Sequence, residues 1–279
     1  MTRLLLMEGN TAEKRAAAAN LGVRSSSEIY CLALRGEFPD IALDVINAAD
    51  PDWSIPEGRD FADYDGFVVT GSSLHAYDRE FAVTNQIEVL KMAANAGLPI
   101  FGSCWGLQIA VIAAGGEVKY SPNGREVGIA RKISPTEAGR SHPLLDGKGA
   151  AFDAPCIHYD EVSRLPANAK LLASNAHSIV QAAVVPLGST EVWAVQYHPE
   201  FDLDQLVQLY TLYADDMIAQ GFFADRAALD DYVASLRGLA ENPDDAGLGW
   251  QLGMDEDITD PKRRRTEIVN WLNACVLKR

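Results

Sequence analysis

One cysteine of this chain has the neighbours that a covalent nucleophile needs. Cys104 lies in the run Gly102-Ser-Cys-Trp-Gly106, between an apolar segment at 99–101 and an apolar helical run at 107–114. This Gly-x-Cys-x-Gly pattern is the thiol version of the Gly-x-Ser-x-Gly elbow, where a strand turns sharply into a helix and glycine fits beside the nucleophile. The N-terminus of that helix favours the negatively charged thiolate. We therefore predict that Cys104 is a reactive nucleophile.

A base and an acceptor for that base follow a predicted strand at 192–196. His198 can take up and return a proton near neutral pH, and Glu200 can accept a hydrogen bond from the second ring nitrogen. The residues alone leave open whether this is an ordinary loop pair, because the sequence does not show how far they lie from Cys104. Their spacing differs from the His-Glu-x-x-His zinc motif, so we expect neither a metal ion nor another cofactor.

The elements around Cys104 must bring these groups together. In the first half, apolar strands are expected at 3–8, 41–46, 67–70 and 99–101, and helices at 12–21, at 80–96, and after the serines 25–27 with an apolar stripe at Ile29, Leu32 and Leu34. This alternation predicts a parallel sheet with right-handed crossovers, covered on both faces. Ligands of such sheets bind beyond the carboxyl ends of the strands, where Gly71 and Cys104 both fall.

The second half is less regular. Strands are expected at 118–120, 127–133, 151–157, 169–173, 179–185 and 192–196, and helices at 203–220 and 226–239. A Gly-, Pro- and Asp-rich loop at 241–260 precedes a last helix at 262–277, whose apolar stripe consists of Ile268, Trp271, Leu272 and Val276. We expect a main domain at 1–221 and a C-terminal helical extension at 222–279 that packs on it.

The composition excludes several classes of partner. A formal net charge of −15 over 279 residues argues against a nucleic-acid surface, which needs a basic face. The basic run at 262–265 is interpreted as a solvated helix start that faces the acidic stretch at 255–260. The four cysteines are too scattered for a disulfide framework or a redox pair, and no apolar run has membrane-spanning length. We therefore expect a cytoplasmic protein that binds neither nucleic acid nor membrane.

The two candidate motifs together resemble a known family. Gly102-Ser-Cys-Trp-Gly-Leu-Gln108 and Tyr197-His-Pro-Glu200 are similar to the motifs of class I (triad-type) glutamine amidotransferase domains, in the branch of the GMP synthase amidotransferase domain. The resemblance covers approximately residues 1–220. It implies an open, mostly parallel α/β sheet flanked by helices in flavodoxin-like layers, and a catalytic triad of Cys104, His198 and Glu200.

The same resemblance implies further site residues. The segment Val69-Thr-Gly71-Ser72 matches the family's oxyanion-hole loop, with Gly-Ser-Ser where relatives often have Gly-Gly-Pro, and Trp105 supplies the second backbone N–H. Gln108 matches a residue that helps hold glutamine. The segment Cys156-Ile-His158-Tyr-Asp160 resembles the family's Ser-His-Gly-Asp stretch, whose acidic residue faces the substrate's α-amino group. From its residue type alone, Asp160 also fits a turn or a helix cap.

The implied reaction is hydrolysis of the γ-carboxamide of glutamine through a γ-glutamyl thioester on Cys104, releasing ammonia and glutamate. The sequence holds no Gly-x-x-x-x-Gly-Lys-[Ser/Thr] motif and no recognisable synthase region, so a separate synthase subunit is the expected acceptor of the ammonia. Two alternatives stay open. One is a stand-alone hydrolase of γ-glutamyl amides or peptides, and the other is a regulatory subunit without enzymatic activity.

Overall fold

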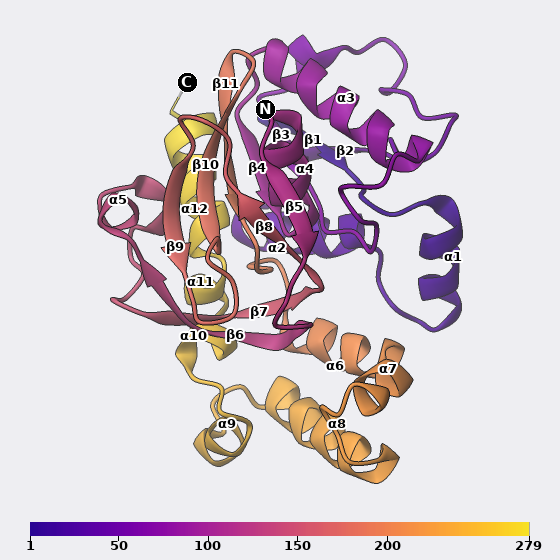
Figure 1. Cartoon of the computed structure of the whole chain (residues 1–279), viewed down its shortest axis with the longest axis vertical. Helices are drawn as coiled ribbons and strands as arrows, with labels where there is room; N and C mark the ends of the chain where they lie inside the picture. The colour runs from indigo at the N-terminus through magenta and orange to yellow at the C-terminus, as the bar shows by residue number, and fades with distance from the viewer. Residues whose placement is uncertain (279) are drawn as a thin grey trace.

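The strands of the first half lie side by side and run in one direction. In this computed structural model, which describes residues 1–278, they belong to a nine-stranded sheet of order β2-β1-β3-β4-β11-β10-β9-β6-β7 (Figure 1). The parallel strands are β1 (Arg3–Met7), β2 (Ala42–Ile46), β3 (Gly66–Val69), β4 (Ile100–Ser103) and β11 (Thr190–Val195). The antiparallel strands are β6 (Glu126–Pro135), β7 (Phe152–His158), β9 (Lys170–Ser174) and β10 (Ala182–Leu187). The prediction of an open α/β sheet is confirmed, and the sheet is mixed, with one parallel and one antiparallel half.

A smaller two-stranded sheet pairs β5 (Glu117–Tyr120) with β8 (Asp160–Arg164). The sequence analysis missed β8 because its segment Asp-Glu-Val-Ser-Arg has a single apolar residue. That residue, Val162, is buried opposite Val118 of β5. Asp160 is the first residue of β8 and lies opposite Tyr120, so this small sheet places a carboxylate close to the main sheet.

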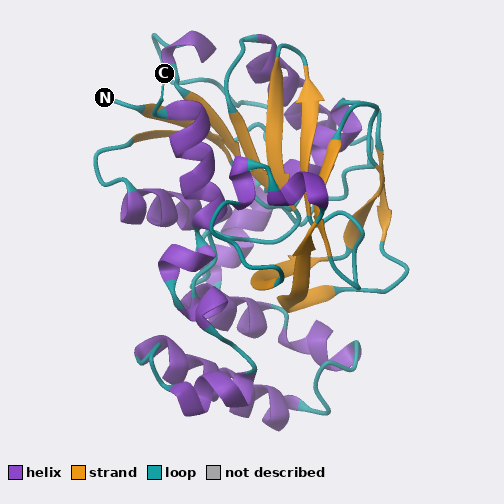
Figure 2. Ribbon diagram, turned by 90° about the vertical axis from the view of Figure 1, so that its left-hand side faces the viewer, coloured by secondary structure: helices purple, strands orange, loops and turns teal. Residues whose placement is uncertain are grey.

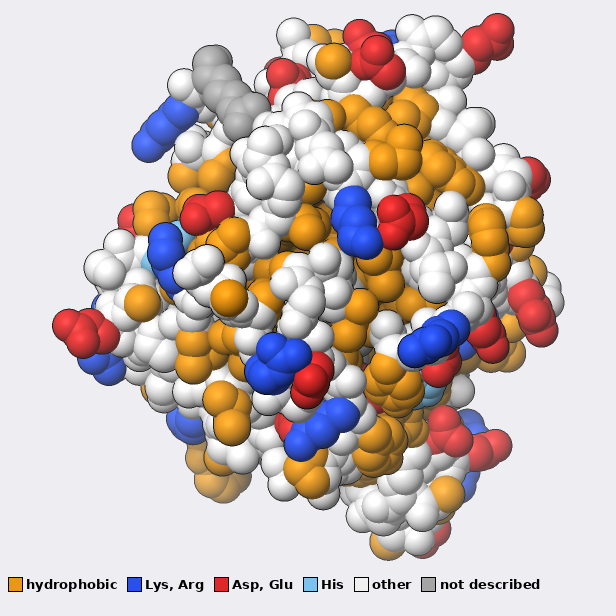
Figure 3. Space-filling view, turned by 45° about the horizontal axis from the view of Figure 1, so that its top comes forward, with side chains coloured by type: hydrophobic (Ala, Val, Ile, Leu, Met, Phe, Trp, Pro, Cys, Tyr) orange, Lys and Arg blue, Asp and Glu red, His pale blue; other side chains and the backbone are white. Residues whose placement is uncertain are grey.

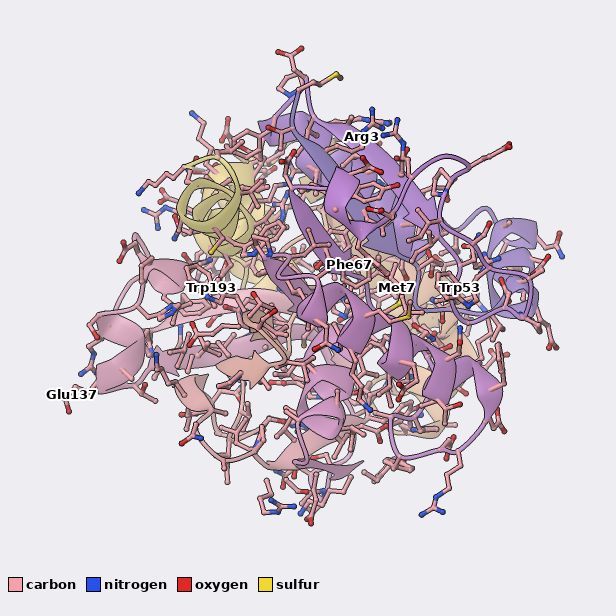
Figure 4. The ribbon with its side chains drawn as sticks, turned by 90° about the horizontal axis from the view of Figure 1, so that it is seen from above. Arg3, Met7, Trp53, Phe67, Glu137 and Trp193 are labelled. Carbon is pink, nitrogen blue, oxygen red and sulfur yellow. The ribbon has the colours of Figure 1, made fainter. Side chains whose placement is uncertain are left out.

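Helices cover both faces of the main sheet (Figure 2). Alternation along β1 sends Leu5 and Met7 to the face that carries α3 (Phe81–Asn95) and α4 (Trp105–Ala113), and sends Leu4 and Leu6 to the face that carries α2 (Ser26–Glu37). Seen from above in Figure 4, Met7 and Phe67 lie near the centre of the molecule, where they join the first of these two cores. Burial on both faces explains why the parallel strands are almost entirely apolar.

Capping side chains fix the starts of the first two helices. Thr11 caps α1 (Ala12–Asn20), and Ser25 forms a capping box with Glu28 at the start of α2, as the serine run predicts. The predicted stripe of α2 is wrong at Leu32, whose side chain is exposed. Tyr30 is buried instead, and its hydroxyl donates a hydrogen bond to Ser103, the last residue of β4.

The second half departs from the prediction in two places. The helix expected at 203–220 breaks at Tyr213 into α6 (Leu203–Leu212) and α7 (Ala214–Ala219), followed by α8 (Arg226–Glu241). The prediction of a loop at 241–260 is wrong, because Asp245 and Asp255 cap two short helices, α9 (Ala246–Leu252) and α10 (Glu256–Thr259). The remaining short elements are α5 (Glu137–Arg140) and the 3₁₀ turns Phe61–Asp63 and Pro143–Leu145.

The C-terminal residues return to the main sheet. The helix expected at 262–277 consists of α11 (Pro261–Arg264), α12 (Thr266–Trp271) and one π-helical turn, Leu272–Val276. The predicted stripe is buried, and the ring of Trp271 lies 5.7 Å from that of Phe101 on β4. We propose that residues 222–279 form an extension of the domain at 1–221, because the last helix shares the core of the sheet.

One polar contact ties this last helix to the end of β11. The hydroxyl of Tyr197 donates a hydrogen bond of 2.6 Å to Glu267, and the Nζ atom of Lys148 lies 3.2 Å from the same carboxylate oxygen. All three side chains are buried. Tyr197 directly precedes His198, so α12 supports the backbone that carries the predicted base.

Basic side chains lie singly among acidic and apolar ones on the face shown in Figure 3. In the basic run, Arg263 pairs with Glu256 and Asp257 of α10, as predicted, but Arg264 is buried. Burial lowers the pKa of Arg264 to about 10. Among the helices of residues 1–278, none is both long and apolar enough to cross a membrane.

Candidate active site

Cys104 lies at a strained junction between β4 and α4. Its backbone has φ 51° and ψ −95°, a conformation that non-glycine residues rarely adopt and that is typical of functional sites. A Cβ atom on Gly102 would lie 2.8 Å from Gly106 Cα, and one on Gly106 would lie 3.0 Å from the carbonyl of Val69. Both glycines are therefore required by the close approach of strand and helix, as the elbow motif predicts.

The His198 ring is fixed from several sides. Its Nδ1 lies 2.7 Å from Oε1 of Glu200, and both side chains are buried. The ring stacks on Phe201 at a centroid distance of 3.9 Å, and a Cβ on Gly71 would lie 2.7 Å from its Cε1 atom. Its Nε2 atom is buried without a hydrogen-bond partner, and Cys104 lines the same cavity. The imidazole therefore presents one unused nitrogen toward a reacting group.

The electrostatic surroundings favour a protonated His198. Burial by itself lowers the pKa of His198, but the charge of Glu200 and the interactions with Cys104 outweigh it and raise that pKa to about 10. A protonated imidazole that is bound to Glu200 and lies in one cavity with Cys104 can give its proton to a reacting group. In this geometry the proton needed by a leaving amine is already on the base.

Two residues that the sequence analysis did not single out hold Glu200. The hydroxyl of Ser103 donates to Glu200 Oε1 at 2.9 Å, and Tyr30 of α2 donates to Ser103 at 2.6 Å. Burial, followed by the charge of Glu200, raises the pKa of Tyr30 well above its usual value, so its hydroxyl stays a donor. Ser103 directly precedes the nucleophile in the sequence, but its partner is 97 residues away.

The loop assigned to the oxyanion hole lies beside the His198 ring. Gly71 and Ser72 follow β3, and Trp105 is the first residue of α4, whose first N–H groups have no acceptor within the helix. The indole of Trp105 donates to Gln86, which donates to the carbonyl of Gly9. These buried contacts connect the end of β1 with the start of α4 through α3. The role of the backbone N–H groups of Gly71, Ser72 and Trp105 stays a prediction.

Gln108, His158 and Asp160, the residues predicted to bind the substrate, are joined by hydrogen bonds. Gln108 Nε2 donates to the backbone carbonyl of Asp160 at 3.2 Å, and Nδ1 of His158 lies 2.9 Å from the same carbonyl. The other ring nitrogen of His158 contacts Glu126 at 2.8 Å. Both ring nitrogens of His158 therefore have protein partners, so His158 supports the position of Asp160 and has no free nitrogen for a substrate.

Asp160 has two partners that the sequence did not indicate. Its carboxylate accepts from Nδ1 of His75 at 2.7 Å and from the hydroxyl of Tyr77 at 3.2 Å. The rings of His75 and Tyr77 stack on each other at 5.4 Å. No local pattern predicts this contact, because His75 lies 85 residues before Asp160 in the chain.

A cavity of about 350 Å³ joins the predicted catalytic and substrate residues. Cys104, His198 and Asp160 line it, together with residues of α6 and with Tyr213 between α6 and α7. Among residues 1–278 there is no group of three or more His, Cys, Asp or Glu side chains placed to hold a metal ion. The cavity thus places a thiol, an imidazole and a carboxylate along one wall of residues.

The remaining cysteines lie outside the cavity. Cys156 is fully buried, and burial raises its pKa well above the usual value. Burial also raises the pKa of Cys31, which is half-buried on α2. Both environments favour the neutral thiol.

Comparison with known proteins now decides the family. Residues 39–210, more than half of the chain, match the family model "Glutamine amidotransferase class-I". The chain belongs to the class I glutamine amidotransferase family. The predicted resemblance is therefore confirmed.

Two relatives and one solved structure show the range of similarity to this amidotransferase chain. It is 35% identical to the gamma-glutamyl-L-1-hydroxyisopropylamide hydrolase of a Pseudomonas species, over 99% of this chain and 93% of that one. It is 32% identical to the GMP synthase of Symbiobacterium thermophilum, over 37% of this chain and 19% of the synthase. The crystal structure of a glutamine amidotransferase from Thermotoga maritima covers 99% of this chain and 98% of its own, with a TM-score of 0.68 and 14% identity.

The two relatives are similar to this chain over different lengths. The match to this synthase spans 104 residues. The hydrolase similarity extends over both the sheet and the C-terminal helices. The structural similarity to the Thermotoga protein shows that the two chains share this α/β fold.

Proposed function

We propose that this chain hydrolyses a γ-glutamyl amide bond with Cys104 as nucleophile, His198 as general acid and base, and Glu200 as the residue that orients His198. One observation carries the proposal: Cys104, on its strained turn, and the His198 imidazole, which is bound to Glu200, line the same cavity. A thiol, a base and an acceptor for that base are the parts that covalent amide hydrolysis needs. A regulatory subunit without activity would have no use for a strained, positive-φ cysteine.

The reaction proceeds in two steps. The Cys104 thiolate attacks the γ-carbonyl carbon and forms the C–S bond, and the C–N bond breaks as Nε2 of His198 gives its proton to the departing nitrogen. Water then attacks the thioester, His198 takes a proton from it, and glutamate leaves as the thiolate is restored. In both steps, backbone N–H groups of Gly71, Ser72 and Trp105 are the proposed donors to the oxyanion.

Glutamine is the first proposed substrate, with ammonia passed to a separate synthase subunit. A substituted γ-glutamyl amide is the second candidate, and two observations favour it. The cavity continues from the triad to apolar and aromatic side chains of Phe201, Leu209 and Tyr213, which suit an organic substituent on the amide nitrogen. The full-length relative is named as a hydrolase of such an amide. In either case we propose a cytoplasmic location, because a reducing compartment protects a thiolate nucleophile.

The test is steady-state turnover by the purified chain of glutamine and of γ-glutamyl amides with alkyl substituents. The proposed function requires release of glutamate by the wild type and its loss in Cys104→Ala, with Cys31→Ala as a matched control outside the cavity. Labelling by diazo-oxonorleucine should occur at Cys104. Release of glutamate that survives Cys104→Ala would contradict the proposal, and a higher kcat/KM for the alkyl amides than for glutamine would decide for the second substrate.

A further inference from the structure

Arg125 is a buried cation in the wall of the cavity that the proposed reaction does not use. It directly precedes β6, and its guanidinium carbon lies 4.5 Å from the ring centre of Tyr159 and 4.4 Å from that of Tyr213. The Tyr159 hydroxyl accepts a hydrogen bond from Gln220 of the α7 end, which holds one of these rings in place. The two aromatic faces orient the guanidinium plane within the wall.

The N–H groups of this guanidinium lack protein acceptors. The side chain is 2% exposed, and its Nε and Nη1 atoms are buried without a hydrogen-bond partner. The acidic side chain paired with it, Asp216, is 4.0 Å from Nη1, beyond hydrogen-bond distance, and is 59% exposed. Aromatic faces compensate part of the charge but accept nothing in the plane of the donors, so burial of Arg125 is unfavourable until an acceptor binds.

The other basic side chains around the cavity have partners. Lys14, Arg15 and Arg24 all lie at its rim and are tied to protein acceptors, which are Ser73, Asp50 and Asp202 respectively. Among the lysine and arginine side chains that line the cavity in the described part of the chain, Arg125 is therefore the one whose Nε and Nη1 donors have no protein acceptor. In a chain of net charge −15, such an arginine is the natural place for an anionic group of a ligand.

The geometry points to Arg125 as the residue that binds a carboxylate of the γ-glutamyl substrate. A planar guanidinium fork matches a carboxylate, and a γ-glutamyl compound carries an α-carboxylate on every molecule. A γ-glutamyl peptide carries a second carboxylate on the amine side. This inference rests on the proposed function for the identity of the ligand, but the recognition of carboxylate over carboxamide by Arg125 can be measured by itself.

Three ligands distinguish the two sources of carboxylate. They are γ-glutamylglycine, the same compound with its α-carboxylate converted to carboxamide, and γ-glutamylglycinamide, in which the glycine carboxylate is the one converted. Each is compared as a substrate of the wild type, Arg125→Gln and Arg125→Lys. Arg164→Gln is the matched control, because it removes an exposed arginine from β8 outside the cavity. The same three ligands are titrated by calorimetry into the Cys104→Ala chain with and without Arg125→Gln.

In Arg125→Gln, kcat/KM for γ-glutamylglycine should fall about 100-fold, as expected for loss of a charged hydrogen bond, while one of the two amidated ligands changes less than about 3-fold. If the insensitive ligand is the α-carboxamide, Arg125 binds the α-carboxylate, and if it is γ-glutamylglycinamide, Arg125 binds the amine side. Arg125→Lys should recover part of the loss, since it keeps the charge without the fork.

Equal losses for all three ligands would mean that Arg125 only holds β6 against α6 and α7, and the inference would be wrong. Because the ligands are compared within one preparation, a partly unfolded variant does not imitate the expected pattern. Should the wild type turn over neither these three ligands nor glutamine and the alkyl amides, the proposed function would fail. The calorimetric preference for carboxylate, and its loss in Arg125→Gln, would still decide the role of Arg125.

Discussion

Ser103 donates a hydrogen bond of 2.9 Å to Oε1 of Glu200, the same oxygen that receives Nδ1 of His198. The residue directly before the nucleophile therefore holds the carboxylate that orients the base. Ser103 is the last residue of β4 and Cys104 follows it directly. The end of this one strand therefore positions both the proposed nucleophile and the carboxylate that orients the proposed base.

Ser103→Ala should lower kcat by about 3- to 30-fold with little change in KM, because one buried hydrogen bond to a charged group is lost while the substrate contacts remain. Tyr30→Phe should act in the same direction and more weakly, since it acts through Ser103. The measurement is steady-state kinetics, with Ser235→Ala on α8 as a control. A change confined to KM would contradict a positioning role for Ser103.

The three proposed catalytic residues should differ in how much activity their removal leaves. Cys104→Ala and His198→Ala should abolish turnover. Glu200→Gln should lower kcat about 100- to 10,000-fold and leave a rate above that of Cys104→Ala, because Glu200 orients the base and carries no proton. A Glu200→Gln rate as low as that of Cys104→Ala would require a direct role for the carboxylate.

The raised pKa of His198 predicts a pH dependence of stability. The folded state binds this proton more tightly than the unfolded state, so the contribution of His198 to the free energy of unfolding is complete below about pH 6.5 and is lost as pH rises to about 10. Thermal unfolding of the wild type and of His198→Ala, measured from pH 6 to 10, checks this. The difference between the two melting temperatures should shrink toward pH 10, and a difference that grew with pH would contradict the assignment.

Gly71→Ala should strongly reduce kcat while the protein stays folded. The added Cβ would lie 2.7 Å from Cε1 of His198, so the ring must move away from the position that Glu200 and Phe201 define. We expect a loss of about 10-fold or more, since small displacements of a catalytic group are costly. Gly247→Ala on α9 is the matched control, and an active Gly71→Ala enzyme would show that the ring has more room than the structure gives it.

Dialysis against a chelator should leave the rate unchanged, because the proposed nucleophile is a thiolate and His198 is bound to Glu200. The assay is glutamate release before and after EDTA treatment, with and without added Zn²⁺ or Mg²⁺. Recovery of a lost rate by either ion would overturn this expectation.

The sequence predicted those parts of the site that depend on neighbours in the chain. The glycines at 102 and 106 indicate the elbow because each lies two residues from Cys104. The serines at 25–27 predict a helix cap, and the structure shows Ser25 in a capping box with Glu28. Asp245 and Asp255 carried the same kind of capping signal, but the glycines and prolines around them obscured the two short helices.

Other parts depend on contacts that no local pattern encodes. His75 meets Asp160 only because β3 ends and β8 begins near one cavity, and Arg125 meets Tyr213 only after α6 packs beside the sheet. A histidine or arginine in a polar segment looks the same whether its partner is water or a distant side chain. The substrate side of the site was therefore less predictable than the nucleophile.

The bond between Tyr197 and Glu267 sets an order of events during protein synthesis. A ribosome that has added residue 220 has already made every residue proposed for catalysis, and the strands can begin to pair as they emerge. The backbone beside His198 still lacks its support, because α12 has not been made. The hydrogen bond from Tyr197 to Glu267 is therefore added to the proposed site only after α12 has been made and has packed on the sheet.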